Sequence, residues 1–94
     1  MYAQVLEGRA LPERRPELER IIRNKLIPAL REEEGFCGAL HLVDCNTDET
    51  RIILCWETEE QAARPPCKSN LAALGAVCSE FGVRYSVWEV GARA

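Results

Sequence analysis

The sequence predicts an α+β fold, a four-stranded antiparallel sheet with two helices on one face. Two observations lead to this prediction. Strand-like and helix-like segments follow one another in the order β-α-β-β-α-β, and the segment "RIILCWE" is apolar at consecutive positions rather than at alternate ones. The 94 residues, of which 47% are hydrophobic, are expected to form one domain spanning residues 1–94.

The first half of the predicted fold is a strand followed by a long helix. Tyr2–Arg9 reads as the strand, and Leu11–Phe36 carries apolar residues at helical spacing. Gly35 is a residue type that stops a helix. Pro28 cannot donate to the carbonyl of Asn24, so we expect a kink at this point.

Two further strands, Gly38–Cys45 and Arg51–Glu57, are joined by the turn "NTDET" and form a predicted hairpin. A turn centred on Asp48 sets the register, because side chains alternate between the two faces of a sheet. In that register Leu40, Leu42, Ile52, Leu54 and Trp56 share one face, and Ala39, His41, Val43, Ile53 and Cys55 share the other.

The second helix is predicted to start directly after Trp56. "TEEQ", residues 58–61, has the form of a capping box, in which the Thr side chain accepts from the Gln N–H and the Gln side chain reaches back. Pro65 and Pro66 interrupt this helix, which is expected to resume over Cys67–Phe81 and to end at Gly82. Val83–Val90 is the predicted last strand.

This order of elements is the ferredoxin-like split βαβ arrangement. Two helices cover one face of such a sheet, yet the third strand is apolar on both faces. We therefore expect a homodimer in which a second copy covers the open sheet face, since two-fold homodimers are the commonest oligomers.

Composition and charge exclude several classes. A net charge of −3 argues against a nucleic-acid partner. No apolar run approaches the ~20 residues that cross a membrane, and the N-terminus does not resemble a signal peptide, so we expect a cytoplasmic protein. The five cysteines include no C-x-x-C pair, which argues against a metal site or a redox dithiol. They are expected to be reduced, small, buried apolar residues.

Four stretches carry a resemblance to a known family. "LIPALREEEGFCGALHLVD" combines a helix with a late proline and a Gly-aromatic step into a strand, and "ILCWETEEQA" ends a strand in Trp before a capped acidic helix. "LAALG" and "YSVWEV" resemble the last helix and strand. Together they resemble the antibiotic-biosynthesis-monooxygenase-like domains of the dimeric α+β barrel superfamily.

The resemblance implies a dimer with its two sheets face to face and a pocket between sheet and helices in each subunit. Some members of the family oxidise polycyclic aromatic or quinol-like compounds with O₂ and no metal or flavin, and others degrade haem. The haem-degrading branch uses an Asn on the first strand, a Trp at the end of the third and a His on the second helix. Only Trp56 matches, so haem degradation is disfavoured and no cofactor is expected.

Trp56 is the first candidate for a ligand site. We expect it on the helix-facing side of the sheet, at the wall of an apolar pocket beside the start of the second helix, where its ring could stack on a flat ligand and donate one N–H. The alternative is that the ring only fills the core. Gln4 and Tyr85, on the first and last strands, are further candidates for substrate binding, and Arg84 for an anionic substrate.

His41 is the one histidine and the candidate acid or base. A cofactor-free oxygenase needs a base to form a carbanion or phenolate from its substrate. The predicted register also sets His41 opposite Cys55, which raises a Cys–His nucleophile pair as an alternative. The remaining alternative is a surface or interface histidine.

Two functions therefore remain open. One is a cofactor-independent monooxygenase acting on a small aromatic compound. The other is a small-molecule-binding or structural dimer of the same fold without turnover, because a fold alone does not fix a function.

Overall fold

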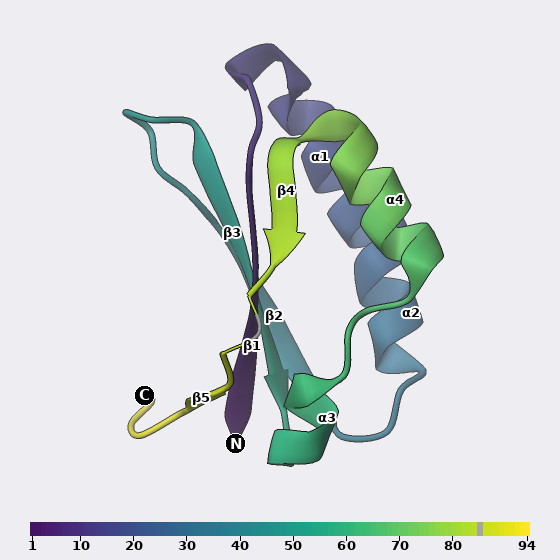
Figure 1. Ribbon diagram of the computed structural model, residues 1–94, viewed down its shortest axis with the longest axis vertical. Helices are drawn as coiled ribbons and strands as arrows, with labels where there is room; N and C mark the ends of the chain where they lie inside the picture. Colours follow the sequence, from purple (N-terminus) through teal and green to yellow (C-terminus); the bar gives the residue numbers. More distant parts are fainter. Residues whose placement is uncertain (85) are drawn as a thin grey trace.

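The computed structural model describes residues 1–84 and 86–94, and it has the predicted α+β architecture, an antiparallel sheet with the helices on one face (Figure 1). The elements in chain order are β1 (Tyr2–Arg9), the 3₁₀ turn η1 (Pro12–Arg14), α1 (Arg15–Ile21), the π-helical turn η2 (Ile22–Leu26), α2 (Ile27–Arg31), β2 (Phe36–Val43), β3 (Glu49–Trp56), α3 (Glu59–Ala63), α4 (Lys68–Val77), β4 (Ser79–Val83) and β5 (Trp88–Glu89).

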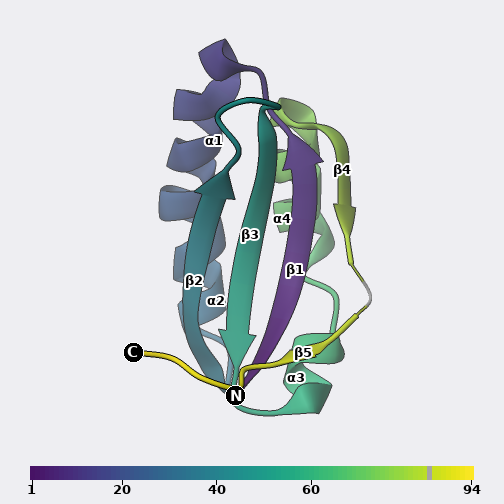
Figure 2. The ribbon, with the colours of Figure 1, turned by 90° about the vertical axis from the view of Figure 1, so that its left-hand side faces the viewer.

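The sheet has the strand order β2-β3-β1-β4, and the short β5 also pairs with β1 (Figure 2). The two central strands, β3 and β1, are in register along their whole length, with Tyr2 opposite Trp56 and Arg9 opposite Glu49. All helices lie behind the sheet in the view of Figure 2, so the face toward the viewer carries no helix. The core lies between the other face and the helices and contains six apolar side chains with almost no exposure: Leu6, Leu18, Leu26, Ile52, Leu54 and Leu74.

The predicted register of the β2–β3 hairpin is wrong. Leu40 lies opposite Ile53, and His41 lies opposite Ile52. The shift is an odd number of residues, so it moves the side chains of β2 to the opposite face relative to those of β3. A register irregularity between Phe36 and Gly38, where Gly38 has φ +154°, accompanies this pairing.

In the observed register the expected face is correct for the apolar residues of β3 and wrong for those of β2. Ile52, Leu54 and Trp56 are buried against the helices. Leu40 and Leu42, which were expected beside them, lie on the other face with 61% and 50% of their surface exposed.

The long first helix ends at Arg31, earlier than predicted, and the effect of Pro28 takes a particular form. The N–H of Ile27 bonds to the carbonyl of Ile22, five residues back, which makes one π-helical turn directly before the proline. Because Pro28 has no N–H to continue the regular ladder, the extra residue of the π turn is accommodated there. Gly35 has the positive φ of +84° that its predicted role required.

The capping box at the start of α3 is present as predicted. The Oγ1 of Thr58 accepts from the N–H of Gln61 at 3.2 Å, and the Gln61 Oε1 accepts from the N–H of Thr58 at 3.1 Å. Gly35 packs directly against this box, because a Cβ at Gly35 would overlap the Gln61 side-chain amide. The helix ends at Ala63, before Pro65 and Pro66, as the sequence indicated.

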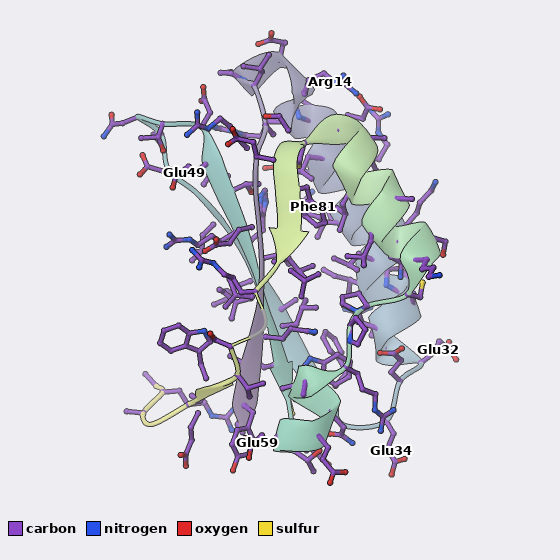
Figure 3. The ribbon with its side chains drawn as sticks, in the orientation of Figure 1. Arg14, Glu32, Glu34, Glu49, Glu59 and Phe81 are labelled. Carbon is purple, nitrogen blue, oxygen red and sulfur yellow. The ribbon has the colours of Figure 1, made fainter. Side chains whose placement is uncertain are left out.

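The end of the chain departs from the prediction. The second long helix, α4, ends at Val77 rather than near Phe81, and Gly82 lies within strand β4 instead of ending the helix. The expected single last strand, Val83–Val90, is replaced by two short strands, β4 and β5. Figure 3 shows Phe81 between β4 and the helical layer, where its ring packs against the core.

The five cysteines are all free, and the expectation that they are buried is correct only for Cys78. Cys55 is half-buried, and Cys37, Cys45 and Cys67 are exposed. Cys37 is on the edge strand β2, Cys45 is in the hairpin turn and Cys67 directly precedes α4. The spacing of cysteines in the sequence does not reveal these positions.

Candidate functional site

Trp56 closes β3 on the helix-facing side of the sheet, as the sequence predicted. Its side chain is 4% exposed, and Tyr2 and Phe36 lie opposite it on the two neighbouring strands. The Phe36 and Trp56 rings meet edge to face with centroids 5.6 Å apart at 70°. This geometry is favourable for an aromatic pair, so the indole is held in a defined orientation.

Gln4 lies one pleat away from Trp56 on the same face, opposite Leu54 on β3. It is 2% exposed, and its Nε2 donates to the carbonyl of Arg64 at 2.5 Å, which ties β1 to the segment after α3. The Gln4 Oε1 and the Trp56 Nε1 are both buried and have no hydrogen-bond partner among the described residues.

Such unpaired atoms are unusual. A buried polar atom without a partner costs about 1–3 kcal/mol, and most buried polar atoms in proteins are paired. Gln4 supplies an acceptor and Trp56 a donor, and both belong to neighbouring positions of the same sheet face. Both atoms lie on the helix-facing side of the sheet, and Trp56 also lines the cavity described next.

A cavity of about 160 Å³ lies beside Trp56, between the end of the first helical segment and α3. It is lined by Glu33, Glu34, Trp56, Gln61, Arg64 and Pro65. Figure 3 shows Glu34 beyond the end of α2, at the same end of the molecule as Glu59 of α3. The expectation of an apolar pocket is wrong, because charged and amide groups make up most of the wall.

His41 lies on the helix-facing side, and this placement overturns the suggested Cys–His pair. Cys55 is on the opposite face of the sheet and pairs with Gly38 rather than with His41. The His41 ring instead bonds through Nε2 to the Oγ1 of Thr50 at 2.6 Å, and that hydroxyl donates to the carbonyl of Leu42 at 3.3 Å. Burial lowers the pKa of His41, Glu19 opposes this change and Arg15 reinforces it.

The structure does not bring His41 and Trp56 together. His41 is opposite Ile52, four residues before Trp56 on β3, which at the rise of a strand is a separation of roughly 13 Å. The titratable side chains that line the cavity at Trp56 are Glu33, Glu34 and Arg64.

The other candidates lie elsewhere. Tyr85 is outside the described residues. Arg84 and Arg51 both pair with Glu7, through Nε at 2.6 Å and 3.1 Å, so Arg84 takes part in a charge cluster. None of the described residues form a group of three or more His, Cys, Asp or Glu side chains that could hold a metal ion. No helix in the described part of the chain is long and apolar enough to span a membrane.

Sequence reasoning missed four residues of these two regions: Thr50, Glu33, Glu34 and Arg64. Thr50 is a buried polar residue on β3, and only the correct hairpin register would have set it beside His41. Glu33 and Glu34 belong to a run of three glutamates after the apolar stripe of the first helix, and such a run carries no signal for a site. Arg64 takes part through its backbone carbonyl, for which the sequence carries no signal.

In this protein a helical layer covers one face of an antiparallel sheet, and polar groups are buried between the two layers near the end of β3. We compared this arrangement with proteins of known family and structure. No family model matches the chain, and no curated protein matches it. Solved structures do match. A putative antibiotic biosynthesis monooxygenase from Deinococcus radiodurans is 18% identical over 100% of this chain and 96% of its own, with a TM-score of 0.69.

Two further structures of this fold hold ligands. The ActVA-Orf6 monooxygenase of Streptomyces coelicolor, in complex with nanaomycin D, is 16% identical over 99% of this chain and 90% of its own, with a TM-score of 0.74. A point mutant of MhuD, with two manganese protoporphyrin IX molecules bound per active site, is 17% identical over 100% and 98%, with a TM-score of 0.69. The chain thus has an antibiotic-biosynthesis-monooxygenase-like fold, as the sequence predicted.

Proposed function

We propose that this protein is a homodimer that binds a small, flat aromatic compound beside Trp56 and Gln4, between the sheet and α3. The observation that carries this proposal is the pair of unpartnered buried atoms, Gln4 Oε1 and Trp56 Nε1. A ligand that enters from the cavity beside Trp56 and displaces the groups that cover these atoms would bond to both through an acceptor and a donor on one edge. These bonds would offset the cost of burying the two atoms without partners.

The aromatic character of the proposed ligand follows from the Trp56 ring in the cavity wall. The Trp56 indole, fixed by the edge-to-face contact with Phe36, offers a ring surface with a donor at its edge. A cavity of about 160 Å³ is smaller than the 300–1,000 Å³ typical of sites for drug-sized molecules. A ligand of one or two rings is therefore favoured over a larger system.

Haem is disfavoured as the ligand. β1 has no Asn, which the haem-degrading pattern has on its first strand, and the chain's one histidine is on β2, away from Trp56. The residues around Trp56 in the described part of the chain thus include no imidazole to coordinate iron. No cofactor is proposed.

Cofactor-independent oxygenation is the second candidate function. The monooxygenases from Deinococcus radiodurans and Streptomyces coelicolor that share the fold favour it. The reaction would need a base near the ligand, and at Trp56 the groups available for this are the carboxylates of Glu33 and Glu34. Binding without turnover needs only the atoms already described, so the geometry supports binding best.

The open face of the sheet supports the homodimer. Leu40, Leu42 and Trp88 are 61%, 50% and 60% exposed, and Val5, Ile53 and Trp88 line a groove of about 440 Å³ on this face. Exposed apolar patches of this kind mark interaction surfaces. A second copy would cover the face by the two-fold symmetry that is commonest among oligomers. We further propose a cytoplasmic location, in keeping with the free cysteines.

The ligand proposal is tested with 2-quinolone, a flat two-ring compound with a carbonyl acceptor beside an N–H donor. Binding is followed by the two indole N–H resonances in ¹⁵N NMR. We expect the Trp56 resonance to shift and the Trp88 resonance to stay, with binding weakened roughly three- to tenfold in Trp56→Phe. Trp88→Phe is the matched control. A shift confined to Trp88 would refute the site.

Turnover is tested with 1-naphthol, a two-ring compound that O₂ converts to 1,4-naphthoquinone and water. Oxygen uptake above the uncatalysed rate, lost in Glu33→Gln or Glu34→Gln, would establish the second candidate. Uptake equal to the buffer rate together with 2-quinolone binding leaves the binding function alone.

The dimer is tested by sedimentation equilibrium. Twice the chain mass of 10.6 kDa is expected, with dissociation in Leu40→Glu. Leu11→Glu, at a leucine 55% exposed outside the sheet, is the matched control and should remain dimeric. A wild-type protein that sediments as a single chain would refute the homodimer.

A further inference from the structure

A second cavity lies on the helix-facing side of the sheet, at the edge strand β2 and away from Trp56. Its volume is about 230 Å³. The wall combines apolar residues with one imidazole, one carboxylate and one guanidinium: Glu19, Ile22, Arg23, Ile27, Ala39, Leu40, His41 and Ile52. Leu40, whose side chain is on the open face, borders the cavity at the edge strand. An apolar cavity with a few convergent polar groups is the usual form of a small-molecule site.

The His41 ring is held in one orientation in this cavity. The hydroxyl of Thr50 has a single proton, which it donates to the carbonyl of Leu42. The hydroxyl can therefore only accept from His41, so the proton of the neutral ring is on Nε2. Nδ1 has no partner among the described residues and keeps its lone pair for an incoming donor.

The π-helical turn shapes the opposite wall. In a regular α-helix, residues five apart point in directions about 140° apart. Ile22 and Ile27, joined by the π-type bond, nevertheless both line the cavity. Pro28 is the local cause of this turn, so the proline sets the shape of the site although it does not line it. Single π turns inside helices often occur at functional sites.

The charges around the cavity argue against an ionic ligand. Burial lowers the pKa of His41, with Glu19 opposing and Arg15 reinforcing the shift, which favours the neutral ring at neutral pH. The charged groups of the wall are Glu19 and Arg23, one of each sign, and neither takes part in the ion pairs seen among the described residues. A neutral molecule therefore suits the cavity better than a carboxylate or an amine.

We propose that this cavity is a second ligand site, which binds a small neutral molecule with one hydroxyl group on an apolar body through His41 Nδ1. The hydroxyl donates to Nδ1, and the apolar body packs on Ile22, Ile27 and Ile52. The volume accommodates one ring or a short aliphatic chain. This site is independent of the one proposed at Trp56.

The test uses p-cresol and toluene, which differ by the hydroxyl, and reads the His41 ring by ¹⁵N NMR. His41 is the one histidine in the chain, so its ring signals are unambiguous. We expect p-cresol to shift the Nδ1 resonance and to bind roughly three- to tenfold more tightly than toluene. Equal affinity of the two compounds, no response of His41, or a response at the Trp56 indole alone would overturn the proposal.

Three variants sharpen this test. Thr50→Val removes the hydroxyl that fixes the tautomer, so the ¹⁵N shifts should report a mixture of Nδ1–H and Nε2–H forms and p-cresol should lose its advantage. Pro28→Ala should restore a regular helix and weaken both compounds together. Trp88→Phe, on the open face of the sheet, is the control and should leave p-cresol binding unchanged. The comparison in the wild-type protein decides the proposal even if a variant fails to fold.

Discussion

The two faces of the sheet differ in an unexpected way. The face covered by helices contains two buried polar atoms without partners among the described residues, on Gln4 and Trp56. The open face exposes large apolar side chains such as Leu40 and Trp88, while its charged residues Glu7, Arg51 and Arg84 pair with one another. A single chain in water would favour the reverse on both faces. This contrast is the basis of the two proposals made above, a small molecule bound on the covered face and a second copy on the open face.

The largest change in stability on the covered face is expected from Trp56→Ala. The substitution removes the largest side chain of the covered face and should lower the free energy of unfolding by about 3–5 kcal/mol. Urea denaturation followed by far-UV circular dichroism measures the change. Trp56→Phe is the matched control, because it keeps the contact with Phe36 and deletes only the unpaired N–H.

Trp56→Phe should lie within about 1.5 kcal/mol of the wild type, because the cost of a smaller ring is partly offset by loss of the unpaired donor. Affinity for 2-quinolone should nevertheless fall. If the phenylalanine variant lost as much stability as the alanine variant, the indole N–H would have a partner in solution, and the contrast between the two faces would disappear.

The next largest effect is a difference in unfolding free energy between substitutions at Leu54 and Ile53. These neighbours on β3 point to opposite faces of the sheet. Leu54→Ala should cost about 2–5 kcal/mol, since Leu54 is fully buried among the helices. Ile53→Ala, on the open and half-buried side, should cost about 1 kcal/mol at low protein concentration. The Ile53 effect should grow as the concentration rises, because association is linked to stability. Denaturation at two concentrations measures this, and equal costs for both variants would contradict the assignment of faces.

The same hairpin shows how far the sequence determines the fold. The sequence placed Ile52, Leu54 and Trp56 on one face of β3, and "TEEQ" predicted that α3 starts directly after Trp56, which sets this face beside a helix. The pairing partner of each residue was not predictable, because it depends on where the turn and the irregularity at Gly38 lie. "GALHLVDC" is apolar at enough positions on both faces to satisfy either register.

The candidate sites were predictable in part for the same reason. Trp56 was found because a strand end and a helix cap adjoin it in sequence. The partners of His41 were missed because the register error placed it on the wrong face. The contact between Gln4 and the carbonyl of Arg64 joins residues 60 positions apart, and local patterns carry no information on such contacts. The polar lining at Trp56 arises from the chain path after α2, which ends at Arg31, before the stop expected at Gly35.

A smaller effect is expected at the cap that holds α3 over Trp56. Thr58→Ala removes the capping side chain and should cost about 1 kcal/mol, within the range of 0.5–2 kcal/mol for such changes. Hydrogen exchange should show faster exchange over Glu59–Ala63, because this short helix depends on its cap. Thr47→Ala, in the exposed hairpin turn, is the control. Unchanged exchange in α3 would indicate that packing against the sheet, not the capping box, holds the helix.

The smallest effect concerns the pH dependence at His41. Burial lowers the pKa of His41 in the folded protein below its ordinary value of 6.5, with Glu19 opposing and Arg15 reinforcing the shift. The unfolded chain then binds more protons than the folded one as the pH falls, so the stabilisation is present above pH 6.5 and is lost as the pH falls through the folded pKa. Denaturation of the wild type and of His41→Gln from about pH 7 to about pH 5 isolates this contribution. The wild type should lose more stability than the variant over this range.

Because the ring is only half-buried and one carboxylate opposes the shift, the difference should be smaller than the effect of the cap. A variant that lost more stability than the wild type would mean that His41 is protonated in the fold and takes part in an ion pair, and the cavity beside it would then suit an anion instead of a neutral hydroxyl compound.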